Sequence, residues 1–409
     1  MKNKVLDIVL KTVSYILVAA LASVLTLVLY TPVSNLLPFT IYPNGKGAAT
    51  TEVEQTADKL RQLLNLIDSC HVGDVDMQTL GDAAADAIVA ATGDQWSAYI
   101  PLSYIQEHME NQDNAYVGIG ITILADSSEY GFLIQAVEPD GPAHKAGILP
   151  GDILIGAEGQ SFAGKDIDYS GELIRGEEGT QVTVSVLRDG ETLTFTVERA
   201  VIHTTVAAGQ LLEDNVGYML LANFNTGSAQ QAIDVIEDLR SQGAESLIID
   251  VRFNFGGYID ELVVLLDYLL PEGKLLTSVD YTGKENVRWS DEKELDMPIA
   301  VLVNAYSYSA SEFFAAALNE YDRALVVGTP TVGKGYYQVD LELSDGSVVA
   351  LSTGKYYTPN GVSLADAGGL TPEVLVEVDI ETEALIYGQL LPLVEDPQVL
   401  AALEGLKGE

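Results

Sequence analysis

The carboxy-terminal half of this 409-residue chain alternates between short apolar runs and longer amphipathic segments. The runs typical of strands are 216–224, 246–252, 299–305 and 323–328, and the segments typical of helices are 229–243, the residues after the Gly-Gly pair at 256–257, and 311–321. Parallel strands joined by crossover helices produce this alternation. We therefore predict an α/β core with crossover βα units over 201–380, followed by a helical segment over 381–409.

Between 114 and 200 the pattern changes to short strands, and the last two meet at an Asp-Gly hairpin signal. A Gly-Ile-Gly-Ile stretch, Gly118, Ile119, Gly120 and Ile121, precedes one of the strands. Its glycines let consecutive backbone amides converge on one point, which suits the carboxylate of a peptide C-terminus. The peptide would then add as an extra strand along the adjacent sheet edge.

The segment GPAHKAGILPGD at 141–152 matches the A-x-x-A-G-(I/L)-x-x-G-D signature of bacterial PDZ domains. The β-rich module over 114–200 thus resembles a PDZ domain inserted before the α/β core. The resemblance implies that proteins or peptides with free C-termini bind at 118–121. The alternative, that the two glycines only relax a strand, is less favoured beside this second motif.

The N-terminus carries Lys2, Lys4 and Lys11 before an uncharged apolar run. We predict a cytoplasmic tail over 1–12 and a transmembrane signal anchor over 13–30, because the run has the length of one membrane helix and the lysines orient it. The rest of the chain would then lie outside the cytoplasm, attached to the cell membrane by a single pass. A cleaved signal peptide is the competing interpretation, since Ala-Leu-Ala at 20–22 resembles a cleavage site.

Residues 31–50 are rich in Pro, Gly, Ser and Thr, which is typical of a linker. Apolar residues over 51–113 follow a helical spacing, so we expect an N-terminal helical segment there. We interpret it as a cap or a dimerisation element, which would make a homodimer. Cys70 is the only cysteine, so one chain forms no internal disulfide.

The strongly negative net charge limits which classes of molecule can bind this protein. The chain has 60 acidic and 21 basic residues, for a net charge of -39. A surface this negative repels nucleic acids, which are therefore not expected as partners. Nothing in the sequence implies a metal or an organic cofactor.

The segment GTPTVGKG at 328–335 is nearly a phosphate-binding loop. Gly335 stands where such a loop needs a Ser or Thr, and the residues after it form a strand pattern instead of a helix. A nucleotide site is therefore excluded. Lys334 needs another explanation.

Ser309 lies between a predicted strand and a predicted helix. With Glu312 it forms an S-x-x-E capping box, so one interpretation is that Ser309 only caps the helix. A serine at a helix N-terminus also lies where developing negative charge is favoured. None of the four histidines is in a catalytic motif, so a lysine made neutral by burial, such as Lys334, is the natural candidate for its base.

These features together resemble the carboxy-terminal processing peptidases, which are Ser/Lys serine proteases with a PDZ domain. The resemblance covers about 80–405, through the PDZ signature and five further motifs. The motifs are ATGDQWSAYI at 91–100, DVRFNFGG at 250–257, NAYSYSASE at 304–312, GTPTVGKGYYQ at 328–338 and YYTPNG at 356–361. By resemblance, Ser309 is the nucleophile, Lys334 the general base and Gln338 the group that orients the lysine amine.

The same resemblance implies an oxyanion hole from the amides of Gly257 and Ala310, with Gly256 allowing the backbone to approach the substrate. The sequence departs from the family at three positions that bear on substrate fit, namely Phe255, Tyr308 and Glu373.

We therefore expect an extracytoplasmic serine endopeptidase that recognises C-terminal tails through its PDZ domain. The alternative function is a catalytically silent PDZ scaffold that binds C-terminal peptides. Arg175 follows an apolar helical turn in the PDZ module and is a regulatory candidate, with a partner expected, for instance, in the protease domain.

Overall fold

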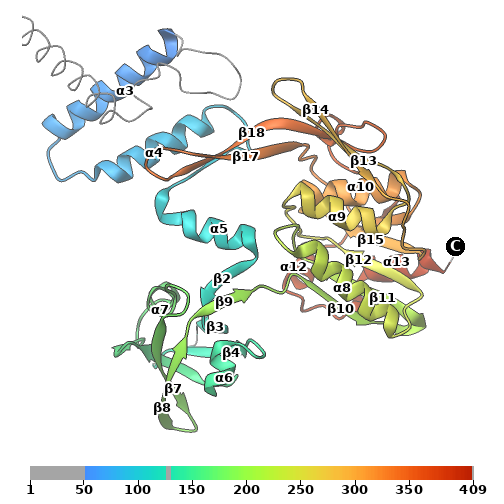
Figure 1. Cartoon of the computed structure of the whole chain (residues 1–409), viewed down its shortest axis with the longest axis horizontal. Coiled ribbons are helices and arrows are strands. Elements are labelled where there is room, and N and C mark those ends of the chain that lie inside the picture. Colours follow the sequence, from blue (N-terminus) through green and yellow to red (C-terminus); the bar gives the residue numbers. More distant parts are fainter. Residues whose placement is uncertain (1–50, 126–129, 408–409) are drawn as a thin grey trace, which may run out of the picture. The chain divides into compact units, whose positions relative to one another are not determined.

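The computed structural model describes residues 51–125 and 130–407 (Figure 1). Three predicted segments lie outside these residues, namely the cytoplasmic tail 1–12, the transmembrane helix 13–30 and the linker 31–50. Among the described helices, none is both long enough and apolar enough to cross a membrane.

The chain divides into two compact units, 1–85 and 86–409. In the first unit, α3 (Thr51–Cys70) is amphipathic in sequence and yet buries none of its side chains. Leu63 and Leu66 of α3 are exposed. α4 (Met77–Ala90) begins in this unit and ends in the second, so the described residues of the first unit have the helical character that the sequence predicts.

A small β-rich module with its own core forms part of the second unit. Its sheet has the order β3-β4-β5-β7-β8, with β6 paired to β5. The elements are β3 (Ile121–Ala125), β4 (Phe132–Val137), α6 (Pro142–Ala146), β5 (Ile153–Ala157), β6 (Gln160–Ser161), α7 (Ile167–Ile174), β7 (Gln181–Arg188) and β8 (Glu191–Glu198). A separate pair, β2 (Ala115–Gly118) and β9 (Ala200–His203), leads the chain into and out of the module. β3 is therefore an edge strand.

A six-stranded sheet with the order β10-β11-β12-β15-β16-β19 forms the centre of the α/β core. Its strands are β10 (Ala207–Leu211), β11 (Val216–Leu221), β12 (Ser246–Asp250), β15 (Ile299–Val303), β16 (Ala324–Gly328) and β19 (Val374–Leu375). Neighbouring strands are parallel except for the antiparallel pair of β10 with β11. β15 is buried along its whole length, as expected for a parallel strand covered on both faces.

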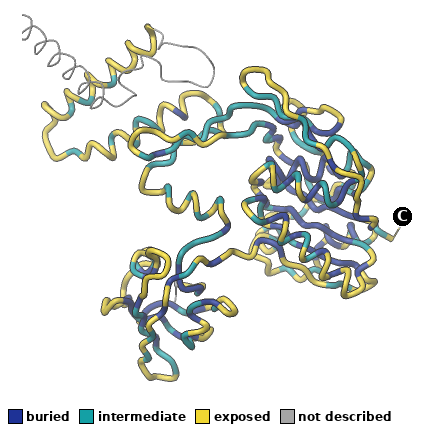
Figure 2. The backbone as a smooth tube through the Cα atoms, in the orientation of Figure 1, coloured by how far each residue is buried: buried dark blue, intermediate teal, exposed yellow. Residues whose placement is uncertain are grey.

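Helices cover both faces of this sheet, and Figure 2 shows how deeply its strands are buried. Side chains of α8 (Ser228–Ser241), α9 (Ile259–Leu269) and α10 (Ala310–Glu320) share one core cluster with Leu247 and Ile249 of β12. The intervening Ile248 packs instead with Val399 of α13 (Pro397–Leu406) on the other face. The predicted α/β core is therefore confirmed.

A second, antiparallel sheet was largely missed by the sequence analysis. It has the order β1-β18-β13-β14, and β17 also pairs with β18. Its strands are β1 (Ala98–Ile100), β13 (Gly273–Asp280), β14 (Glu285–Ser290), β17 (Tyr336–Glu342) and β18 (Val348–Tyr357). β1 falls inside the segment 51–113, which we expected to be helical. It forms a strand because it pairs with the distant β18, Ala98 lying opposite Ala350.

A buried ionic network links the end of β12 to the C-terminal segment. Arg252 lies between Asp250 and Asp396, with nitrogen–oxygen distances of 2.6 and 2.8 Å. Tyr218 donates its hydroxyl proton to Asp250 at 2.7 Å, and burial raises the pKa of this tyrosine. Asp396 also caps α13 by accepting from the Gln398 amide at 2.9 Å. The network therefore fixes α13 against the core sheet.

We predict that Arg252→Met lowers the free energy of unfolding by about 3–5 kcal/mol, because two buried carboxylates lose the guanidinium that pairs with both of them. Chemical denaturation measures this change. The control is Arg240→Met, which removes an exposed pair with Glu237 within α8 and should cost less than about 1 kcal/mol. Equal losses in the two variants would show that the buried network does not hold the C-terminal segment.

Candidate active site

Ser309 lies at the turn between β15 and α10. It is the N-cap of α10, as the sequence predicts, and it is 9% exposed. Its backbone has φ 60° and ψ -125°, which is unusual for a residue with a side chain. Such a conformation costs about 1–3 kcal/mol and persists at functional sites where the surroundings impose it.

Glu312 supplies part of that constraint. Its carboxylate is fully buried and accepts four hydrogen bonds. One oxygen accepts from the Ser309 amide at 2.9 Å and the Lys334 amide at 2.8 Å. The other accepts from the Gly333 amide at 2.7 Å and the Thr331 hydroxyl at 2.5 Å. One carboxylate thus joins the backbones of the predicted nucleophile and the predicted base. From the sequence, Glu312 is predicted only to cap the helix.

Lys334 reaches into an aromatic environment. Its Nζ lies 5.1 Å from the ring centre of Trp96 and 5.7 Å from that of Tyr308. No carboxylate of the described residues is within salt-bridge distance of Nζ. Burial lowers the pKa of Lys334, and the charges of Glu312 and Asp94 offset only part of this effect. A larger fraction of the amine is therefore neutral at a given pH than for a lysine in water.

The two glycines of the Gly-Gly pair each lie against a neighbouring segment, Gly256 against the Ser309 turn and Gly257 against the backbone of Phe224. A Cβ on Gly256 would lie 2.8 Å from the Ser309 Cβ and 2.9 Å from the Ala310 nitrogen. Gly257 has φ 151°, and a Cβ there would lie 2.3 Å from the carbonyl carbon of Phe224. Both positions therefore require glycine.

The amides near Ser309 differ in their availability. The Gly256 amide donates to the Asn254 side chain at 2.9 Å. Among the described residues, neither the Gly257 nor the Ala310 amide donates a hydrogen bond within the chain. Those two amides are therefore free to bind an oxyanion.

Gln338 lies in β17, close in sequence to Lys334. Its Nε2 donates to Ser352 at 3.0 Å and to the Tyr336 carbonyl at 3.3 Å. The register of β17 shifts between Tyr337 and Gln338, and Lys334 precedes the strand. In an unbroken strand, residues four apart such as Lys334 and Gln338 would lie on one face. The late start of β17 and its register shift mean that this rule does not place them together. Orientation of the lysine amine by Gln338 stays a prediction.

Two aromatic residues at the departures from the family pattern meet beside Ser309. Phe255 stacks on Tyr308 with ring centres 5.1 Å apart, and Tyr308 lies 5.7 Å from Trp96. Phe255 is 51% exposed. The sequence signalled these two positions only as unusual. It did not predict that Tyr308 would contact the lysine.

The Gly118–Ile121 stretch joins β2 to β3, the edge strand of the PDZ-like sheet. Gly120 has φ 74°, which turns the chain between the two strands. Ile119 is buried in the core of the module, and its carbonyl accepts from the Ala143 amide at 2.9 Å. Among the described residues, β3 pairs with β4 on one side only, which is the position that an added peptide strand requires.

Arg175 ends α7, and its side chain is largely exposed. Its guanidinium is 3.8 Å from the carboxylate of Glu110, in α5 (Ile105–Asp113) before the module. This partner differs from the one in the protease domain that the sequence analysis gave as an example. A regulatory role for Arg175 stays a prediction.

Comparisons with known proteins find matches to both the α/β core and the β-rich module. Residues 215–376 match peptidase family S41, and residues 109–198 match the PDZ domain. The carboxy-terminal processing protease CtpA of Bacillus subtilis is 30% identical over 366 residues, covering 89% of this chain and 76% of that protein.

Two solved structures are also similar. A photosystem II D1 C-terminal processing protease has 27% identity and a TM-score of 0.44, covering 79% of this chain and 87% of that one. A structure assigned to the S41 proteases, from Bacteroides fragilis, has 18% identity and a TM-score of 0.50, covering 83% and 92%. The two family matches and the similarity to the Bacillus subtilis protease show that the chain is a serine-type peptidase with a PDZ domain. It belongs to the carboxy-terminal processing peptidases of family S41.

We predict that Lys334→Arg and Lys334→Ala remain folded and lose about 10²–10⁴-fold in kcat, because a guanidinium cannot act as a base. As the predicted base, Lys334 has to be neutral before it can accept a proton. Activity should therefore rise with pH through one ionisation that lies below the ordinary lysine pKa of 10.5. Initial rates across pH measure both effects.

The control is Lys355→Arg. Lys355 lies in β18 and pairs with Asp366, so this variant should keep full activity. Substantial hydrolysis by Lys334→Arg would place the base elsewhere.

We predict that Glu312→Gln lowers kcat by about 10²-fold, because the amide that replaces one oxygen cannot accept the hydrogen bonds which position Ser309 and Lys334. The loss of the negative charge also removes a contribution that raises the pKa of Lys334. The remaining activity should therefore rise at a lower pH than in the wild-type protein.

Glu320→Gln at the other end of α10 is the matched control. Glu320 also accepts two hydrogen bonds, from Thr358 and Asn360, but contacts neither predicted catalytic residue. An unchanged pH profile in Glu312→Gln, together with normal kcat, would contradict the positioning role.

Proposed function

We propose that the protein is an extracytoplasmic endopeptidase that captures protein C-terminal tails on its PDZ domain and cleaves them with a Ser309/Lys334 dyad. One observation carries this proposal above the others. The Glu312 carboxylate binds the backbone amides of both residues, while burial lowers the pKa of the lysine. The same carboxylate thus positions a serine that needs a base and a lysine whose pKa is lowered.

In the proposed reaction, neutral Lys334 takes the proton of Ser309 as the hydroxyl oxygen attacks the substrate carbonyl carbon. The amides of Gly257 and Ala310 stabilise the resulting oxyanion. Protonated Lys334 then gives its proton to the leaving amine, which departs and leaves an acyl-enzyme. Neutral Lys334 next takes a proton from a water molecule as the water oxygen attacks the acyl carbon, and it returns this proton to the Ser309 oxygen as the acyl–oxygen bond breaks and the acid product leaves.

For substrate capture, the proposed peptide pairs with the free edge of β3 and directs its C-terminal carboxylate to the amides of 118–121. The edge position of β3 and the turn at Gly120 support this mode. The rival function, a silent PDZ scaffold, is disfavoured by membership of a peptidase family.

The remaining proposals concern location and assembly. We propose that 13–30 anchors the chain in the cell membrane as a single pass, on the strength of its apolar run and flanking lysines. A homodimer through 51–113 is supported by the exposed Leu63 and Leu66 on an amphipathic helix that buries none of its residues.

We predict that the full-length protein cleaves a peptide with a free apolar C-terminus about 10- to 100-fold more efficiently than its C-terminally amidated form. The difference corresponds to one charge-assisted hydrogen-bonded contact of about 1.5–3 kcal/mol. Values of kcat/KM measure it, and Ser309→Ala should abolish cleavage of both peptides. Equal rates for the two forms would refute tail recognition, whereas persistent cleavage by Ser309→Ala would refute the dyad.

A further inference from the structure

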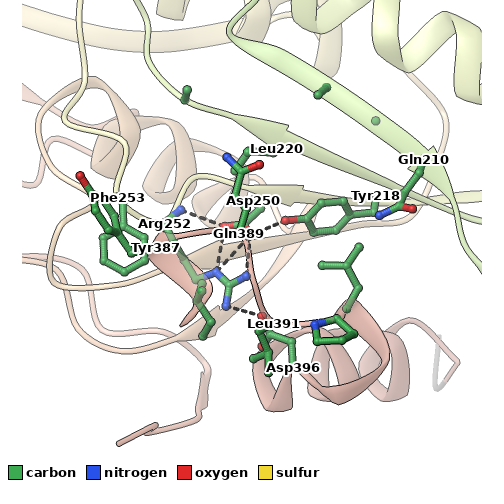
Figure 3. A pocket seen from close by; sticks show the side chains of 16 residues that line it. Gln210, Tyr218, Leu220, Asp250, Arg252, Phe253, Tyr387, Gln389, Leu391 and Asp396 are labelled. Carbon is green, nitrogen blue, oxygen red and sulfur yellow. Dashed lines mark hydrogen bonds and ion pairs between the residues drawn. The ribbon is translucent and has the colours of Figure 1, made fainter. Parts of the chain in front are cut away.

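A cavity of about 570 Å³ lies away from Ser309, on the face of the core sheet that α13 partly covers (Figure 3). Such a volume is within the usual range for a small-molecule site. One wall is formed by β10 and β11, and another by the end of α12 (Ile380–Tyr387) together with the chain that leads from it to α13. The cavity exists because α13 packs on β12, β15 and β16 and leaves the β10–β11 end of this face to a loop.

The lining combines aromatic walls with a charged floor. Tyr218, Phe253 and Tyr387 contribute rings. The charged residues that line the cavity are the network of Asp250, Arg252 and Asp396, in which two carboxylates face one guanidinium. The floor therefore has a formal charge of one negative unit, in a protein that is itself strongly acidic. A cation with an aromatic body complements such a site, because rings also attract cations.

Phe253 connects this cavity to both loops of the predicted active site. Its ring stacks on Tyr306 at 5.5 Å and meets Tyr387 edge-on at 5.2 Å. Tyr306 belongs to the loop that leads to Ser309. Phe253 itself precedes Gly256 by three residues, and its amide donates to the Asn304 side chain at 3.0 Å. A change at Phe253 is thus transmitted to the oxyanion loop and to the nucleophile loop.

Phe253 has a strained backbone, and the Tyr387 ring that contacts its side chain is mostly exposed. Phe253 has φ 59°, which is unfavourable for a bulky residue. Tyr387, which supports its edge, is 67% exposed and belongs to a helix that buries none of its residues. A molecule that filled the cavity against both rings would hold Phe253 in the observed position.

We propose that this cavity is a regulatory site for a small aromatic amine, an arylalkylammonium ion, and that its occupancy increases peptidase activity through Phe253. The ligand ring packs against the sides of Phe253 and Tyr387 that line the cavity, and the net negative charge of the Asp250–Arg252–Asp396 network attracts the ammonium. Binding favours the arrangement in which the Gly256 loop and the Ser309 loop are held together. This site is separate from the PDZ peptide site and from the proposed dyad.

The first experiment measures binding by calorimetry, with the full-length Ser309→Ala protein and phenethylamine as the probe. The neutral phenethyl alcohol and the anionic hydrocinnamate are its matched controls. We expect the amine to bind at least about tenfold more tightly than either control, and less tightly as ionic strength rises. Because the protein is already blocked at Ser309, this result does not depend on the proposed mechanism of cleavage.

A filled-cavity variant links the binding to this site. Ala208 is an exposed residue of β10 that lines the cavity, so Ala208→Trp should fill it without disturbing the core. The control is Ala163→Trp, at an exposed position in the PDZ module. We expect Ala208→Trp to abolish amine binding and Ala163→Trp to preserve it. Phenethylamine should also raise kcat of the wild-type protein and of Ala163→Trp, but not of Ala208→Trp.

Three results would overturn the proposal. No measurable binding of the amine, or equal binding of the amine and the alcohol, would show that the cavity does not select a cation. Retained binding in Ala208→Trp would place the amine elsewhere. Binding at the cavity with an unchanged or lower kcat would show that Phe253 does not transmit activation.

Discussion

The arrangement of the candidate active site depends on one buried carboxylate, that of Glu312. A carboxylate without a paired cation is costly to bury unless donors satisfy its oxygens. Four donors do so here, and they come from the nucleophile turn and from the 331–334 loop. The two segments must therefore come together for the charge to be accommodated. Its place in the first turn of α10 adds a favourable interaction with the helix dipole.

How much of the fold the sequence predicts depends on where each strand finds its partner. β11, β12, β15 and β16 were predicted because buried parallel strands appear as continuous apolar runs between helical patterns. β1 was missed because its pairing with β18 spans most of the chain, and three residues carry no detectable period. β13 and β14 were missed because buried and exposed positions do not alternate along them, so they lack the period that marks a strand.

In the candidate site too, local motifs were predictable from the sequence and long-range contacts were not. Motifs identified Ser309, Lys334 and the Gly-Gly pair, because each carries a residue type that the chemistry requires. The wider role of Glu312 was not predictable, since the capping box accounts for only one of its four hydrogen bonds. The shift of register before Gln338 depends on β18 and leaves no signal in the local sequence. Tyr308 and Phe255 were noticed as unusual, but their stacking is a tertiary contact.

The balance at Lys334 links substrate binding to catalysis in the proposed reaction. The rings of Trp96 and Tyr308 favour the ammonium form by about 0.5–2 kcal/mol, and so does the charge of Glu312. Burial acts in the opposite direction and is the largest of these effects. A peptide bound over the exposed face of Phe255 and Tyr308 would exclude further water from this pocket. Because removing water disfavours the charged form, it would lower the pKa of Lys334 again and make the base available when a substrate is present.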